Sequence, residues 1–315
     1  MEELKTRDSS TYDILYSKIK KLTEMAWADR WEANSDHLSL WLNNFQDSEK
    51  EAALYLLSKF MYFDHSTTRE LMRRVYEDLY RRPIIFKIRK DHDNSADPAL
   101  IENAFEEVLH QTRFLSVGNP SESSSHLLYY FRQENQLKRE LFINPHQLYK
   151  HTQIQDGTIT ASVVTENIKR LIVLDDFCGS GSQATKFHEE FVKFIKKENE
   201  DVKVSYYSLY AIKNGLDKVR ELSYDEVKSI FELDDSYKCF SESSRFFSED
   251  DSKLKSFCKK FCVKYGKRLD SRNPLGYKKG QMMLGFHHNT PNNTLPIFWG
   301  EKDWNPIFKR YKKLY

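Results

Sequence analysis

Two adjacent carboxylates stand directly before a turn of glycine and serine, a combination of residue types that suggests ligand chemistry. The acidic pair is Asp175 and Asp176. A glycine-rich turn that opens a helix exposes backbone N–H groups, and together with the helix dipole it forms an anion site suited to a phosphate. A carboxylate can accept a pair of hydrogen bonds from vicinal hydroxyls. The segment therefore predicts a ribose 5-phosphate site, with the phosphate held by Gly179, Ser180, Gly181, Ser182 and Gln183.

The residues around this turn predict a strand before it and a helix after it. Residues 171–174 (LIVL) are four consecutive apolar residues, which is typical of a strand buried on both faces of a parallel sheet. A helix is expected from about residue 182 to residue 197. Ligands of open parallel sheets bind beyond the carboxyl ends of the strands, and the acidic pair is expected there.

Two protein families share this strand, acidic residue and glycine turn. Residues 171–183, LIVL-DD-FCG-S-G-S-Q, resemble the phosphoribosyltransferase signature: four apolar residues, two acidic, three variable, Thr or Ser, Gly, one variable, Thr. Gln183 stands where Thr is usual, although its amide can still donate a hydrogen bond. Residues 173–181, VLDDFCGSG, are equally similar to the cofactor strand of class I methyltransferases, which use S-adenosylmethionine.

The surrounding sequence favours the phosphoribosyltransferase interpretation. The chain has no (D/N/S)-P-P-(Y/F/W) tetrapeptide, and the next predicted strand, residues 202–212, carries no carboxylate for a cofactor ribose. A phosphoribosyltransferase needs instead an earlier strand, loop and helix to hold pyrophosphate. Residues 113–118 form a short apolar run ended by a turn signal, and a serine-rich loop and an amphipathic run follow. The candidate residues of this pyrophosphate loop are Gly118, Asn119, Ser121 and Ser124.

Segments across most of the chain carry a more specific resemblance. They are HLSLWLNNF near the start, LDDFCGSG, PLGY at 274–277, and TPNNTLPIFW with a nearby WNPIF. Together they resemble a family of bacterial phosphoribosyltransferase-like proteins associated with conflict and anti-phage defence systems. The resemblance implies a type I phosphoribosyltransferase core with helical and C-terminal additions, acting as an effector or regulator in a defence system.

The resemblance also implies roles and ligands. Asp175 and Asp176 would bind the ribose hydroxyls and stabilise a developing oxocarbenium ion, and the ligand would be phosphoribosyl pyrophosphate or a nucleotide. Mg2+ would sit mainly on pyrophosphate, ribose hydroxyls and water, because it dehydrates reluctantly. A protein partner from the defence system would dock on the N-terminal helices.

Alternating strands and helices predict an α/β fold, a Rossmann-like parallel sheet with helices on both faces. A helix is expected to begin at Pro98, because Pro suits the first helical position and Asp97 can cap it, and another helix is expected near residues 225–231. Three consecutive parts are expected: a helical region at 1–95, the phosphoribosyltransferase-like α/β core at 96–245, and a C-terminal extension at 246–315 that completes or covers the core.

Composition excludes several other classes. The formal net charge of +2 argues against nucleic acid as a direct partner, and no apolar stretch approaches the roughly 20 residues of a membrane span. The N-terminus lacks the apolar region of a signal peptide, and four scattered cysteines suit neither a disulfide framework nor a zinc site. A cytoplasmic protein with reduced cysteines and no protein-ligated metal is expected.

Three functions from different classes stay open at this point. The chain could be an enzyme that transfers or releases a phosphoribosyl group, and this is the interpretation towards which we lean. It could be a catalytically inactive sensor that retained the pocket, which Gln183 and the lack of a basic residue in the pyrophosphate loop favour. It could also be a scaffold whose helical layer docks a partner. Turnover of nucleotides separates the first two, and co-purification of a partner tests the third.

Overall fold

The computed structural model describes residues 9–28, 37–118, 123–153, 159–163 and 167–311. Contacts divide the chain into two compact units, Thr68–Leu233 and a second unit formed by Met1–Thr67 with Asp234–Tyr315. This division differs from the three consecutive parts expected from the sequence, since the first and last segments of the chain share one unit. Residues 68–95, expected in the N-terminal helical region, belong to the unit that contains the acidic pair.

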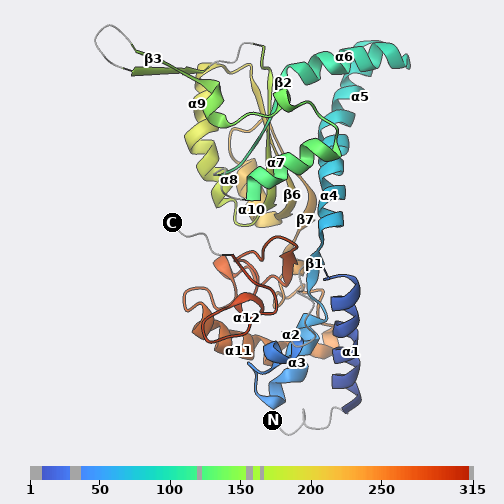
Figure 1. Ribbon diagram of the computed structural model, residues 1–315, viewed down its shortest axis with the longest axis vertical. Helices are drawn as coiled ribbons and strands as arrows, with labels where there is room; N and C mark the ends of the chain where they lie inside the picture. The colour runs from blue at the N-terminus through green and yellow to red at the C-terminus, as the bar shows by residue number, and fades with distance from the viewer. Residues whose placement is uncertain (1–8, 29–36, 119–122, 154–158, 164–166, 312–315) are drawn as a thin grey trace. The chain divides into compact units, whose positions relative to one another are not determined.

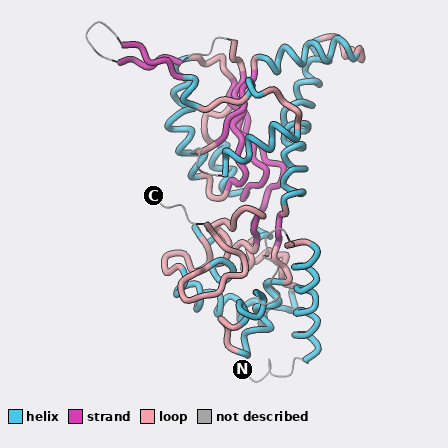
Figure 2. The backbone as a smooth tube through the Cα atoms, in the orientation of Figure 1, coloured by secondary structure: helices cyan, strands magenta, loops and turns pink. Residues whose placement is uncertain are grey.

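A four-stranded parallel sheet forms the centre of the unit Thr68–Leu233 (Figures 1 and 2). Its strand order is β2-β5-β6-β7, with bounds Thr112–Ser116, Arg170–Cys178, Lys203–Ile212 and Glu226–Leu233. All three pairings are parallel, and β5 and β6 are the central strands. The four apolar residues at 171–174 are buried, as a strand covered on both faces requires.

Helices cover both faces of this sheet. One face packs Leu171 and Val173 against the helical run 182–198, which comprises α8 (Ser182–Phe187), a π-helical turn and α9 (Lys193–Glu198), and against α10 (Lys213–Arg220). On the other face, Phe114 contacts Phe131 of α7 (Ser123–Glu134) and Tyr80 of the π-helical segment Val75–Arg81. That segment joins α4 (His65–Arg74) to α5 (Arg82–Asp91), and α6 (Pro98–His110) leads into β2. The predicted α/β class with a parallel sheet is confirmed.

Most local expectations hold in this unit. α6 begins at Pro98, and the Asp97 side chain accepts a hydrogen bond from Ala99 N at 2.9 Å, so the predicted cap is present. Strand β5 continues past the acidic pair to Cys178, four residues beyond the apolar run. A short antiparallel hairpin, β3 (Tyr149–Gln153) with β4 (Ile159–Val163), lies between α7 and β5 in the chain.

The expected helix near residues 225–231 is wrong. This segment is the edge strand β7, paired with β6 in the register Ser205↔Glu226, and the helix of that unit is α10, one segment earlier. Residues 226–233 (EVKSIFEL) place Val227, Phe231 and Leu233 at even spacing, a strand pattern that polar residues obscure. Whether such a segment forms a strand or a helix depends on pairing with a neighbouring strand, and that pairing is not visible in the local sequence.

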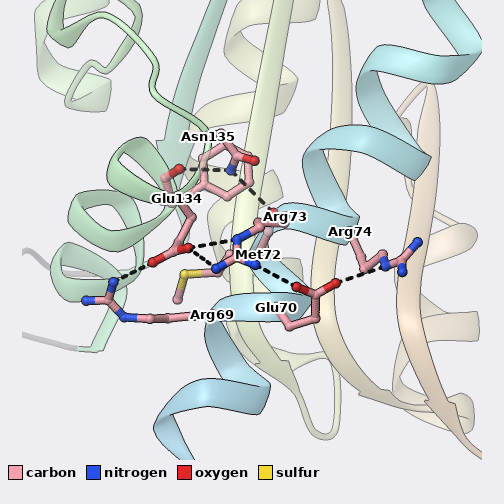
Figure 3. Close-up of polar contacts among 8 residues, drawn as sticks. Arg69, Glu70, Met72, Arg73, Arg74, Glu134 and Asn135 are labelled. Carbon is pink, nitrogen blue, oxygen red and sulfur yellow. Dashed lines mark hydrogen bonds and ion pairs between the residues drawn. The ribbon is translucent and has the colours of Figure 1, made fainter.

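A cluster of ion pairs fastens α7 to α4 in the same unit (Figure 3). Glu134, the last residue of α7, pairs with Arg69 and with Arg73, whose Nη2 lies 2.7 Å from Glu134 Oε2. The Glu134 side chain is only 10% exposed, whereas Glu70, which also pairs with Arg73, is 49% exposed. Because two cations share one largely buried carboxylate, this contact fixes the end of α7 more firmly than the surface pairs around it.

The other unit has its own core of aromatic and aliphatic side chains. Its elements are α1 (Ser9–Met25), α2 (His37–Leu42), α3 (Asp47–Leu57), α11 (Ser252–Leu269), α12 (Pro296–Trp299) and the parallel pair β1 (Met61–Phe63) and β8 (Leu284–Phe286). The indole N–H groups of Trp41 and Trp304 both donate to the carbonyl of Ile297, at 2.8 and 3.0 Å. The TPNNTLPIFW segment is therefore part of this unit's core.

No helix in the described part of the chain is both long enough and apolar enough to cross a membrane.

Candidate functional site

The acidic pair lies within β5, near its carboxyl end, and its two members occupy different environments. Asp175 is level with Ser208 of β6 and is only 8% exposed, whereas Asp176 is partly buried. The two carboxyls lie close enough to interact, because a side-chain hydrogen bond links Asp176 to Asp175. The strand continues to Cys178 before the glycine turn begins.

A tyrosine of the neighbouring strand engages Asp175. Tyr206, fully buried on β6, donates its hydroxyl to Asp175 Oδ2 at 2.5 Å. Burial, followed by the negative charge of Asp176, raises the pKa of Asp175 to about 7. Nothing in the sequence pattern singled out Tyr206, because the contact depends on the register between β5 and β6.

The glycine–serine turn has the geometry of an anion site. Gly181 caps the helical run 182–198 with φ of +76°, a left-handed conformation that favours glycine. The hydroxyls of Ser180 and Ser182 lie 3.0 Å apart, and Ser182 and Gln183 are exposed in the first turn. First-turn N–H groups have no partner within their own helix, and the positive end of the helix dipole lies there.

A second glycine, Gly215, packs against the turn, and the sequence analysis did not identify it. A Cβ placed on Gly215 of α10 would lie 2.2 Å from the carbonyl oxygen of Gly179, and one on Gly181 would lie 2.6 Å from the carbonyl oxygen of Gly215. The backbones of the turn and of α10 are therefore in direct contact. The one available signal was a glycine inside a helix directly after a strand, which marks a close backbone approach.

The candidate pyrophosphate loop leaves the sheet beside the acidic pair. Val117 N donates to Leu174 O at 3.1 Å, and Gly118, with φ of +97°, follows. Asn119 and Ser121 lie outside the described residues. Ser124 lies in the first turn of α7, and its side chain is likewise outside what the structure describes. The loop thus begins at the expected edge, between β2 and α7.

The donors at this edge fit a magnesium ion carried by a ligand better than a resident metal. Among the described residues, no group of three or more histidine, cysteine or acidic side chains could hold a metal ion. Mg2+ keeps several of its waters and commonly binds through substrate phosphates. The hydroxyls and N–H groups of the turn suit those phosphates.

His287 and His288 belong to the other unit. The His287 ring lies 5.1 Å from the ring of His65 and 4.8 Å from that of His288, in edge-on contacts. These contacts favour a structural role for the two histidines.

A parallel sheet with an acidic pair and a glycine–serine turn at the end of a central strand defines a phosphoribosyltransferase-like α/β protein. The family model named PRTase-CE, a phosphoribosyltransferase family of conflict systems, matches residues 38–310. The chain belongs to the PRTase-CE family, and the resemblance inferred from its sequence is confirmed.

Solved structures and curated proteins add little to this assignment. Xanthine-guanine-hypoxanthine phosphoribosyltransferase of Helicobacter pylori is 10% identical, with 55% of this chain and 87% of that chain covered and a TM-score of 0.26. Orotate phosphoribosyltransferase of Aeropyrum pernix is 13% identical, with 41% and 64% covered and a TM-score of 0.24. No curated protein matches the chain.

Proposed function

We propose that the protein binds a ribose 5-phosphate ligand, phosphoribosyl pyrophosphate or a nucleotide, and serves as an effector or regulator in a bacterial anti-phage defence system. The observation that carries the ligand is the turn at residues 179–183. Its left-handed Gly181 opens a helix beside an acidic pair, with Ser182 and Gln183 exposed. Membership of a conflict-system family supports the biological role.

In this proposal the turn holds the 5-phosphate through first-turn N–H groups and the hydroxyls of Ser180 and Ser182. The acidic pair supplies the carboxylate that contacts the ribose, and the loop that begins at Gly118 holds pyrophosphate. Mg2+ bound to the ligand would neutralise phosphate charge. Turnover would depend on positioning and on negative charge near an oxocarbenium-like centre rather than on a general base.

The test of this function is calorimetric titration of phosphoribosyl pyrophosphate with Mg2+ into the wild type and a Ser180→Ala/Ser182→Ala variant. We expect saturable binding by the wild type and binding at least roughly tenfold weaker in the variant, because hydrogen bonds to a charged group are each worth about 1.5–3 kcal/mol. Ser236→Ala, in the other unit, is the matched control and leaves binding unchanged. Binding of S-adenosylmethionine in place of the phosphoribosyl ligand would overturn the proposal in favour of a methyltransferase.

A ligand sensor without turnover is the second candidate. Gln183 replaces the usual Thr of the motif and is exposed in the first turn, where it alters one phosphate contact. Incubating the protein with phosphoribosyl pyrophosphate, Mg2+ and a mixture of nucleobases distinguishes the two functions. Release of pyrophosphate supports the enzyme, and tight binding without release supports the sensor.

A further inference from the structure

The acidic pair is asymmetric in a way that its sequence does not suggest. The Asp175 carboxyl is engaged inside the protein: it accepts from Tyr206 and from the backbone N–H of Phe177, and it contacts Asp176. Asp175 is 8% exposed, which leaves little of it accessible to a ligand.

Asp176, the next residue of β5, is only partly buried. β2 and β5 pair with Ser116 opposite Leu174, and the hydrogen bond from Val117 N to Leu174 O continues this pairing. The chain therefore leaves β2 for the candidate pyrophosphate loop near the start of the acidic pair. Asp176 is the more exposed of the two acids and so the more accessible to a ligand.

Tyr206 is held firmly enough to fix Asp175. Its ring is fully buried and lies 5.7 Å from the ring of Tyr224. The Tyr224 hydroxyl in turn donates to the carbonyl of Ala184 at 3.2 Å, in the first turn of α8. A chain of contacts therefore runs from the helix that follows the phosphate turn, through two tyrosines, to the buried acid.

On the premise that the site binds a ribose phosphate, we propose that Tyr206 is a positioning residue that holds the Asp175 carboxyl inside the protein, so that Asp176 alone contacts the hydroxyls of the ligand. A protonated Asp175 can donate a hydrogen bond to Asp176 and orient it. Loss of that proton would place two negative charges side by side, close to a site for an anionic ligand. The two acids of the motif then have different tasks.

Several ionisable groups influence the protonation of Asp175, and they come from each element packed around it. They are Asp176 and Cys178 on β5, Tyr206 on β6, Tyr224 before β7, and Arg220 on α10 through Cys178. Burial is the largest cause of the raised pKa of Asp175, and the charge of Asp176 is the second. We therefore expect ligand affinity to fall as the pH rises through 7.

The experiment is titration of phosphoribosyl pyrophosphate with Mg2+ into four variants between pH 6 and pH 8.5. Asp175→Asn keeps the hydrogen bonds of a neutral acid, and it is expected to bind within about threefold of the wild type at pH 6. Asp176→Asn is expected to bind at least roughly tenfold more weakly, because it removes a charged acceptor. The titration of the ligand itself affects every variant and cancels in the comparison.

The tyrosine variants test the positioning role. Tyr206→Phe removes a hydrogen bond that lowers the pKa of Asp175, so the fall in affinity moves to a higher pH than in the wild type. Tyr207→Phe is the matched control: it loses a partly buried hydrogen bond, to Glu226 on β7, and retains the wild-type profile. Far-UV circular dichroism of both variants verifies the fold.

Equal losses in Asp175→Asn and Asp176→Asn would overturn this inference, since both acids would then contact the ligand. A pH profile unchanged in Tyr206→Phe would overturn the role of the tyrosine. Absence of binding by the wild type would overturn the proposed function together with the inference, so the two failures are distinguishable.

Discussion

Replacing Asp175 by asparagine should change how the stability of the unit Thr68–Leu233, called here the sheet unit, depends on pH. Burial raises the pKa of this carboxyl from 3.8 to about 7 in the folded protein. Between those values the native state holds a proton that the unfolded chain has already lost. Stability from this site is therefore present at low pH and declines as the pH rises from about 4 to about 7.

The size of the effect follows from the same shift. A rise of about three pKa units, from 3.8 to about 7, corresponds to about 4 kcal/mol, because each unit is worth about 1.4 kcal/mol. Asparagine cannot ionise, and its side-chain oxygen can accept the hydrogen bond from Tyr206. The variant should thus gain stability relative to the wild type as the pH rises, by up to about 4 kcal/mol between pH 4 and pH 8.

The assay must report on the unfolding of the sheet unit, which contains Asp175. The five tryptophans are absent from residues 68–233, so their fluorescence follows the other unit: they are Trp27, Trp31, Trp41, Trp299 and Trp304. Urea unfolding should be followed by hydrogen exchange of peptides from β5 and β6, with far-UV circular dichroism as a second probe. Asp201→Asn, an exposed carboxylate in the turn before β6, serves as the control.

A difference in stability between Asp175→Asn and the wild type that stays constant from pH 4 to pH 8 would refute the reasoning. Asp175 would then be ionised in the folded protein at the same pH as in the unfolded chain, and desolvation would not dominate its pKa. A decline of the same size in Asp201→Asn would be consistent with the prediction, because that variant retains Asp175.

Three further outcomes are expected. Gly215→Ala should weaken binding of phosphoribosyl pyrophosphate at least roughly tenfold in calorimetry, because its Cβ would lie 2.2 Å from the Gly179 carbonyl oxygen and displace the turn; unchanged affinity contradicts the role of this contact. Glu134→Gln should destabilise the sheet unit by about 2–3 kcal/mol in urea unfolding, against less than about 1 kcal/mol for the exposed Glu70→Gln; equal losses would remove the distinction. Tyr265→Phe should lower the stability of the other unit by about 1–2 kcal/mol, measured by tryptophan fluorescence, because it removes a buried hydrogen bond; no change would show that this bond adds nothing.

The sequence by itself determined the features that depend on neighbouring residues. The apolar run at 171–174 indicated a buried strand, the glycine–serine turn indicated a helix start, and Asp97 with Pro98 indicated the start of α6. Each of these signals acts within a few residues through backbone sterics, capping bonds or burial of a short segment. The same local motif, with the segments 274–277 and TPNNTLPIFW, was sufficient for the family.

Tertiary structure decided the features that depend on contacts between distant segments. The strand β7 exists because β6 pairs with it, and one unit is formed from the two ends of the chain. Tyr206 meets Asp175, and Gly215 meets the phosphate turn, only once strand register and helix packing are set. Register and packing are set by the burial of whole faces against one another, and a single sequence does not state which faces will meet. For that reason the chain's sequence located the acidic pair, and the fold made its two members different.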